Sequence, residues 1–119
     1  VVLKKSIFKM VVNFKFDSRI ISKNDKKKLK NFFAKLYSAG YRNFRVQGHT
    51  DSYGSKKYNV KLSKKRASSV KQVSKLLNDI STNLKWFGEN KPVKSNKKPK
   101  GRAENRRVEI SVIWPNVNQ

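Results

Sequence analysis

Segments with the two-residue period of a β-strand alternate along this chain with segments that have the 3.6-residue period of a helix. The strand patterns cover residues 11–16, 44–48, 84–88 and 107–114, and two helix patterns separate the first three of them. A chain that alternates in this way buries its apolar side chains by packing helices on a sheet. The order β-α-β-α-β-β therefore predicts a two-layer α/β (α+β) sandwich, with the helices packed on one mixed sheet.

The two helix patterns have distinct apolar faces. The first follows a capping box formed by Ser22 and Asp25 and stops before Gly40, because glycine commonly ends helices. Its apolar positions recur three and four residues apart, at Leu29, Phe32, Phe33, Leu36 and Tyr37. The second follows a polar turn at residues 53–57, and its apolar positions are Ala67, Val70, Val73, Leu77 and Ile80.

The first and last strand patterns predict which of their side chains enter the core. In the first, the alternation places Val12, Phe14 and Phe16 on one face. In the last, the inward-facing residues are Val108, Ile110, Val112 and Trp114. Residues 89–105 have almost no apolar side chains, so we expect a loop there.

The charge of the chain restricts its partners more than its fold. It has 30 Lys and Arg against 7 Asp and Glu, a formal net charge of +23, and 36% hydrophobic residues, enough for a small core. Such a surface attracts polyanions such as nucleic acid, anionic lipid or an acidic cell wall. Specific nucleic-acid recognition is disfavoured, because the aromatic residues lie at core spacing and no helix-turn-helix or RNA-recognition signature occurs. Non-specific binding of nucleic acid or other polyanions remains the alternative function.

Several classes of catalytic and metal site are missing from the sequence. Cysteine is absent, and His49 is the only histidine, so we expect no metal site. No glycine-rich motif that binds a nucleotide phosphate and no nucleophile-elbow serine occurs, and we therefore expect no cofactor and no enzyme activity. His49 next to Asp51 resembles a general-base pair, but a structural histidine at the end of a strand is the preferred interpretation.

Asp51 stands out because acidic residues are rare in this chain and this one directly follows a strand pattern. Arg66 lies fifteen residues later in the second helix pattern, and Arg106 directly precedes the last strand pattern. Arginine binds planar carboxylates through two parallel hydrogen bonds, which lysine does not. The three residues together would suit a ligand that has both an amino and a carboxylate group. A buried Asp–Arg pair with a purely structural role is the alternative, and spacing alone does not separate the two.

Five motifs give the chain a resemblance to a known family. They lie at residues 14–18 (F-x-F-D-S), 48–54 (G-H-T-D-x-x-G), 58–67 (Y-N-x-x-L-S-x-x-R-A), 88–92 (G-E-x-x-P) and 101–108 (G-R-x-x-N-R-R-V). In this order and at these separations, they resemble the OmpA-like family of peptidoglycan-binding domains, which includes the Pal and MotB types. The resemblance covers almost the whole chain and implies the fold predicted above.

The resemblance implies a function and assigns residues to it. Domains of this family bind the peptide stem of peptidoglycan non-covalently, usually through its diaminopimelate. By the matching motifs, Asp51 would hold the ammonium group of that ligand and Arg66 its carboxylate. The other residues that the resemblance places at the site are Asn59, Arg106, Thr50 and Leu62. His49 remains a structural residue in this comparison.

The resemblance also suggests a cellular setting. The chain begins at Val1 without an initiator methionine or signal peptide, and no run approaches the ~18 apolar residues that span a bilayer. We expect residues 1–119 to be a single domain, the C-terminal periplasmic part of a longer protein that a missing N-terminal segment anchors in the inner or outer membrane. A MotB-like stator or a secretion-system subunit would fit, as a homodimer or within an envelope complex.

Two segments depart from the family pattern, and the first, Arg19-Ile20-Ile21, is short and offers no obvious polar contact to a ligand. The second, residues 91–107, holds eight basic residues and one acidic residue, Glu104. This segment either draws the domain toward the acidic cell wall or is a solvated loop without a function of its own, and we prefer the second interpretation.

Overall fold

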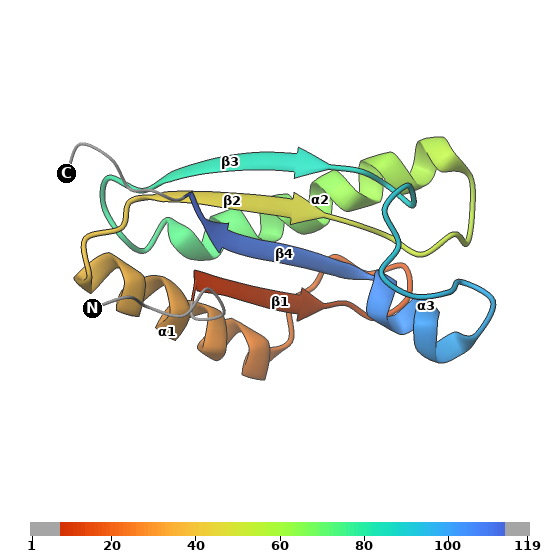
Figure 1. Cartoon of the computed structure of the whole chain (residues 1–119), viewed down its shortest axis with the longest axis horizontal. Helices are drawn as coiled ribbons and strands as arrows, with labels where there is room; N and C mark the ends of the chain where they lie inside the picture. The colour runs from red at the N-terminus through yellow and green to blue at the C-terminus, as the bar shows by residue number, and fades with distance from the viewer. Residues whose placement is uncertain (1–7, 114–119) are drawn as a thin grey trace.

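A computed structural model describes residues 8–113 of the chain as helices packed on a four-stranded sheet (Figure 1). Its elements are β1 (Lys9–Asn13), α1 (Lys23–Ser38), β2 (Asn43–Gly48), α2 (Lys56–Ser74), β3 (Ser81–Trp86), α3 (Pro99–Asn105) and β4 (Arg107–Val112). The two long helices cover one face of the sheet, and α3 lies beyond its end. This arrangement confirms the predicted two-layer sandwich with helices packed on one mixed sheet.

The order of the strands brings several loops to one edge of the sheet. The strands pair in the order β1-β4-β2-β3, with β4 antiparallel to both β1 and β2, and β2 parallel to β3. The first three strands in sequence therefore run in the same direction. Their carboxyl ends meet at one edge of the sheet, next to the start of β4. In open α/β sheets this edge is the usual place for a ligand site.

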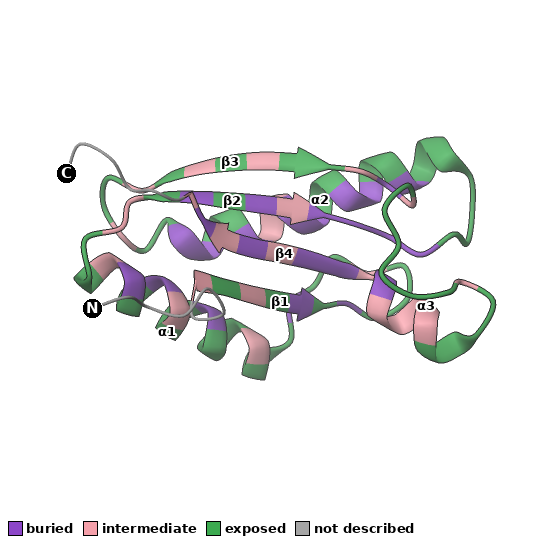
Figure 2. Cartoon of the chain, in the orientation of Figure 1, coloured by how far each residue is buried: buried purple, intermediate pink, exposed green. Residues whose placement is uncertain are grey.

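The core fills the layer between the sheet and the two long helices (Figure 2). Helix α1 presents its predicted apolar face to the core, where Leu29, Phe33 and Leu36 are buried. The buried residues of α2 and of the strands are Ala67, Val70, Val73, Val12, Phe44, Val46, Val108, Ile110 and Val112. Phe32 and Tyr37 are only partly buried. The Ser22 half of the predicted capping box is confirmed, because Ser22 Oγ accepts a hydrogen bond of 3.1 Å from the Asp25 N–H.

The first strand ends earlier than its alternation predicted. Residues 9–13 form β1, and Phe14 is still buried, but the Phe16 side chain is 54% exposed. The prediction that Phe16 enters the core was wrong. The chain turns away from the sheet at Asp17, which has a φ of +55°. The alternation of apolar residues in a sequence does not show where such a turn ends the strand.

The predicted loop at residues 89–105 contains the short helix α3, which the sequence analysis missed. Pro99 occupies its first turn, where the missing N–H costs no hydrogen bond. Gly101 makes the packing possible, since a Cβ there would lie 1.9 Å from the backbone oxygen of Ser95. Among its residues only Asn105 is buried. A helix held by polar contacts has no apolar stripe that would reveal it in the sequence.

The boundaries of two further elements differ from those predicted. Helix α2 begins at Lys56, inside the predicted turn, and ends at Ser74, so Leu77 and Ile80 pack against the core from the following segment. Strand β3 covers Ser81–Trp86 rather than residues 84–88. Trp114 lies outside the described residues. Among residues 8–113, no helix is both long and apolar enough to cross a lipid bilayer.

Candidate functional site

A cavity of about 380 Å³ opens at the edge of the sheet where β1 and β2 end and β4 begins. Its walls come from the segment after β1, the turn after β2, the first half of α2 and the residue before β4. The lining residues are Phe16, Asp17, Asp51, Tyr53, Gly54, Tyr58, Asn59, Leu62, Arg66 and Arg106. Five of the six predicted site residues are among them, and Thr50 is not.

Gly48, the last residue of β2, allows α2 to pack directly on the end of this strand. A Cβ at Gly48 would lie 2.0 Å from the backbone oxygen of Ser63 in α2. Only glycine permits so close an approach of two backbones. The contact brings the inner side of α2 beneath the turn that follows β2, and that turn holds Asp51.

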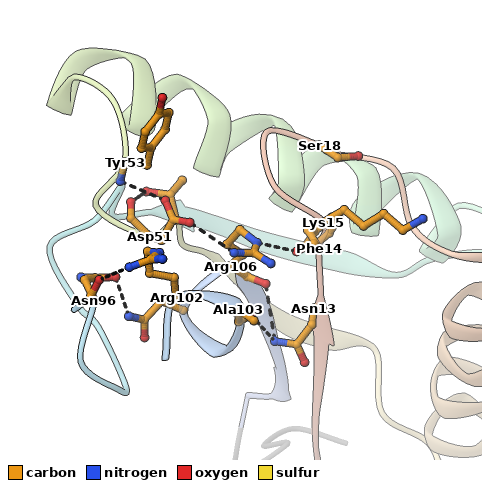
Figure 3. A network of polar contacts seen from close by, with 12 residues as sticks. Asn13, Phe14, Lys15, Ser18, Asp51, Tyr53, Asn96, Arg102, Ala103 and Arg106 are labelled. Carbon is orange, nitrogen blue, oxygen red and sulfur yellow. Dashed lines mark hydrogen bonds and ion pairs between the residues drawn. The ribbon is translucent and has the colours of Figure 1, made fainter. Parts of the chain in front are cut away.

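Asp51 is buried, and its carboxylate has two partners. Oδ1 accepts a hydrogen bond of 3.0 Å from the Tyr53 N–H, a local bond that fixes the turn. Oδ2 lies 3.4 Å from Nη1 of Arg106, at the long end of an ion pair (Figure 3). A carboxylate offers about four acceptor sites, so Asp51 retains capacity for a further donor.

Arg66 lies at the floor of the cavity and is 0% exposed. It donates to the backbone oxygens of Ser18 (2.7 Å), His49 (3.1 Å) and Lys15 (3.3 Å). Burial lowers its pKa to about 10, so the guanidinium stays protonated at neutral pH. These three contacts use three of its five N–H donors.

Arg106 joins the site to the first strand. Its Nε donates to the backbone oxygen of Phe14 at 2.9 Å, while its own backbone oxygen accepts from the Phe14 N–H at 2.9 Å. These two contacts hold the guanidinium between the end of β1 and Asp51 (Figure 3). The resulting position explains why the residue directly before β4 belongs to the site.

The remaining predicted residues support the turn or line the wall. The side-chain amide of Asn59 donates to the backbone oxygens of Asp51 (3.3 Å) and Tyr53 (3.0 Å), which fastens the turn to α2. Leu62 contributes an apolar wall. Thr50 is buried behind the cavity, where its hydroxyl donates to the Asp51 backbone oxygen at 2.8 Å.

Sequence reasoning missed an aromatic and acidic rim around the cavity. Phe16 and Tyr53 pack edge to face with ring centroids 4.9 Å apart, and both are more than half exposed. Tyr58 donates its hydroxyl proton to Asp17 Oδ1, which raises the pKa of Tyr58. All four residues fall inside motifs already recognised. Membership of a motif was therefore the available signal, although it did not indicate which residues face the cavity.

The site concentrates acidic residues in a basic chain. Three of the seven, Asp17, Asp51 and Glu89, lie in the cavity wall or contact it through Asn59. Asp17 and Asp51 balance the charges of Arg66 and Arg106. Residues 8–113 contain no cluster of His, Cys, Asp or Glu suited to a metal ion. Fixed charges of both signs in one cavity are suited to binding a zwitterion.

His49 lies next to the turn but outside the cavity. It is 3% exposed and stacks on Phe87 with ring centroids 5.3 Å apart. Neither ring nitrogen has a hydrogen-bond partner among the described residues. Burial, together with the charge of Arg107, lowers its pKa to about 4, so the ring is neutral at pH 7. These surroundings favour the structural interpretation of His49.

Comparisons with known proteins agree with the geometry. A model of the OmpA family matches residues 13–106 of this chain. Outer membrane porin F of Pseudomonas fluorescens is 44% identical over 108 residues, which cover 85% of this chain and 32% of the porin. Putative lipoprotein YfiB of Escherichia coli is 38% identical over 109 residues, which cover 83% of this chain and 68% of YfiB. The chain thus spans about a third of the porin's length.

A solved structure shows the same fold. The peptidoglycan-associated lipoprotein from Burkholderia pseudomallei superposes with a TM-score of 0.79 at 30% identity, and the match covers 86% of this chain and 88% of the lipoprotein. Together with the family match, this similarity confirms the family resemblance predicted from the five motifs.

Proposed function

Because this chain belongs to the OmpA family, we propose that it binds peptidoglycan non-covalently and anchors an envelope protein to the cell wall. The similar Burkholderia lipoprotein is named for its association with peptidoglycan, which supports this choice of ligand. The proposal is one of recognition and requires no bond to be made or broken.

The observation that carries the proposal is the pairing of Asp51 with two arginines in one cavity. Diaminopimelate in a peptide stem presents an ammonium and a carboxylate on the same carbon atom. Asp51 would accept from the ammonium through its remaining acceptor sites. The remaining N–H donors of Arg66 would meet the carboxylate. Arg106 would then bind either the carboxylate or Asp51.

The other lining residues would shape the site around the ligand's aliphatic chain. Leu62 offers an apolar wall to its methylene groups, and Asn59 holds the turn that positions Asp51. Thr50 supports the same turn from behind. Their contribution is to fix the charged groups in place, so that binding requires little rearrangement.

The cavity should distinguish diaminopimelate from lysine. A lysine in the stem presents an ammonium but no carboxylate at its end. It would satisfy Asp51 and leave the Arg66 donors without a partner. A ligand that leaves a buried hydrogen-bonding group of the protein unpaired binds much more weakly than one that pairs with it, so the cavity should select diaminopimelate over lysine.

The setting proposed for the domain is the periplasm, within a longer protein held at the inner or outer membrane. The outer-membrane and lipoprotein names of the relatives support an envelope location. A stator or a secretion-system subunit as parent, and a homodimeric state, stay predictions.

Retention on purified sacculi tests the proposal. The 119-residue chain should sediment with sacculi whose stems contain diaminopimelate. Free diaminopimelate should displace it, whereas Nα-acetyl-lysine amide at the same concentration should not, because it presents an ammonium without a carboxylate, as a lysine in a stem does. Equal displacement by both compounds would show that the arginines take no part, and the proposed site would then be wrong.

A further inference from the structure

The outer side of α2 carries a row of lysines that the cavity does not use. It consists of Lys57, Lys61, Lys64, Lys65 and Lys71, and we refer to it as the lysine stripe. All five side chains are exposed, and none forms an ion pair among residues 8–113. Spacings of three, four and seven residues place them along one side of the helix, over about 21 Å.

The lysine stripe is unfavourable for the helix that bears it. Lys57, Lys61 and Lys65 follow one another at intervals of four residues, where like charges repel. Helix α2 has no acidic residue to offset this repulsion. Apart from the ring contact of Lys64 with Trp86, no contact among the described residues offsets this repulsion, and such an arrangement indicates a partner outside the chain. By charge complementarity, that partner is anionic.

The stripe and the cavity lie on opposite sides of the same helix. Asn59, Leu62 and Arg66 are buried on the side that faces the site. The five lysines are all exposed, and α2 shows a buried and an exposed side along its length (Figure 2). The two surfaces are therefore largely separate, and Tyr58, an exposed residue of α2 that lines the cavity, lies between them.

Features next to the stripe favour a lipid surface over nucleic acid. Lys64 Nζ lies 4.9 Å from the centre of the Trp86 ring, so one face of that ring is covered and unavailable for stacking on a base. Trp86 and Val60 are 38% and 40% exposed, an apolar border suited to the headgroup region of a bilayer. The stripe contains lysine alone, and it lacks the arginine forks that read phosphates and bases in nucleic acids.

We propose that the lysine stripe of α2 binds the surface of an anionic phospholipid bilayer while the cavity on the other side of α2 remains open to its own ligand. The envelope location under "Proposed function" would place such a surface near the domain, and the inference rests on that location. Each lysine near an anionic bilayer adds an independent electrostatic attraction. The stripe would hold the domain against the membrane without a lipid-specific pocket.

Vesicle sedimentation of two charge-matched variants tests this inference. In the first, the five stripe lysines are changed to Gln. In the second, five exposed lysines elsewhere are changed to Gln, namely Lys85, Lys94, Lys97, Lys98 and Lys100. The probe is vesicles of phosphatidylcholine with 30% phosphatidylglycerol, compared with pure phosphatidylcholine, in about 0.15 M salt. Both variants lose the same charge, so net charge alone predicts equal effects.

The stripe variant should bind the anionic vesicles at least about tenfold more weakly than the wild type, and the second variant should stay within about threefold. A third variant with Arg at the five stripe positions should bind like the wild type. Equal losses in the two Gln variants, or no binding of the wild type to anionic vesicles, would overturn the inference. So would tighter binding to a DNA duplex than to the vesicles.

Sacculus retention separates this inference from the proposed function. The stripe variant should sediment with sacculi as the wild type does, which would also show that it is folded. Loss of sacculus binding in the stripe variant would assign the lysines to the cell wall and overturn the lipid proposal. If the wild type fails to bind sacculi, the proposed function is wrong, and the vesicle comparison still decides the role of the stripe.

Discussion

Oδ2 of Asp51 lies 3.4 Å from Nη1 of Arg106, in an ion pair whose side chains are 6% and 18% exposed. The pair is enclosed, but it is longer than a strong charge-assisted hydrogen bond of about 2.8 Å. If a ligand ammonium bound Asp51 and weakened the ion pair with Arg106, little stabilising energy would therefore be lost. Under the proposed function, the pair would hold the two charges ready for a ligand.

Arg66 should be essential for stability as well as for binding. Arg66→Ala would leave three backbone carbonyls without their donor and open a space beneath the turn. We expect a loss of about 3–5 kcal/mol in the free energy of unfolding, measured by urea denaturation. Arg45→Ala is the matched control because Arg45 is exposed on β2, and it should change stability by less than about 0.5 kcal/mol. Equal stabilities for the two variants would contradict the structural role given to Arg66.

Asn105 should hold the lysine-rich segment before α3. Its Oδ1 accepts from the Val93 and Lys94 N–H groups, and its Nδ2 donates to Lys94 O and Asn96 Oδ1, all within 3.0 Å. Asn105→Ala should cost about 2–4 kcal/mol and speed trypsin cleavage within residues 94–100. Asn96→Ala removes one of these contacts and should cost about 1 kcal/mol. Unchanged cleavage in Asn105→Ala would show that the segment is ordered by other means.

The burial of His49 should make stability depend on pH. Its pKa is about 4 in the folded chain, against an ordinary 6.5, so the unfolded chain binds the extra proton between these values. Stability from this residue is complete above pH 6.5 and declines as the pH falls toward 4. Between pH 7 and about pH 4.5 it should lose on the order of 2–3 kcal/mol.

The variant His49→Phe isolates this effect, because phenylalanine can retain the stacking on Phe87 without titrating. Urea denaturation of both proteins at the two pH values gives the difference directly. If the wild type and His49→Phe lose the same stability on acidification, His49 does not titrate as described.

The sequence predicted the elements that apolar periodicity defines and missed those that polar contacts define. The buried faces of α1 and β4 follow from spacing alone, because residues such as Leu29 and Ile110 recur at fixed intervals. Helix α3 lacks such spacing. It is held in place by the close approach of Gly101 to the Ser95 backbone and by hydrogen bonds from the Asn105 side chain to backbone groups. Phe16 fits the strand alternation, but β1 ends at Asn13 and Phe16 lies in the turn closed by the hydrogen bond from Ser18 N–H to Lys15 O, where it lines the cavity.

The candidate site shows the same division. The scarcity of acidic residues and of arginine singled out Asp51, Arg66 and Arg106, and the fold brings these three residues to one cavity. The carbonyl contacts of Arg66 could not be foreseen, because two of the acceptors are backbone groups 48 and 51 residues away. Every chain has such acceptors, and only the fold determines which of them an arginine meets.

The most direct test of the central claim is sacculus retention of Asp51→Asn. Asparagine keeps the shape of the side chain and the oxygen that accepts from the Tyr53 N–H, but it removes the charge that would match an ammonium. Asp79→Asn is the control, since it removes the same charge from an exposed position with a φ of +61°, which asparagine tolerates.

Asp79→Asn should melt within a few degrees of the wild type, whereas Asp51→Asn should melt lower, because it leaves the arginines of the cavity without their acidic partner; binding is therefore compared at a temperature where both variants are folded. We predict that Asp79→Asn binds sacculi like the wild type and that Asp51→Asn binds at least about tenfold more weakly. Folded Asp51→Asn that sediments with sacculi as well as Asp79→Asn would contradict the account.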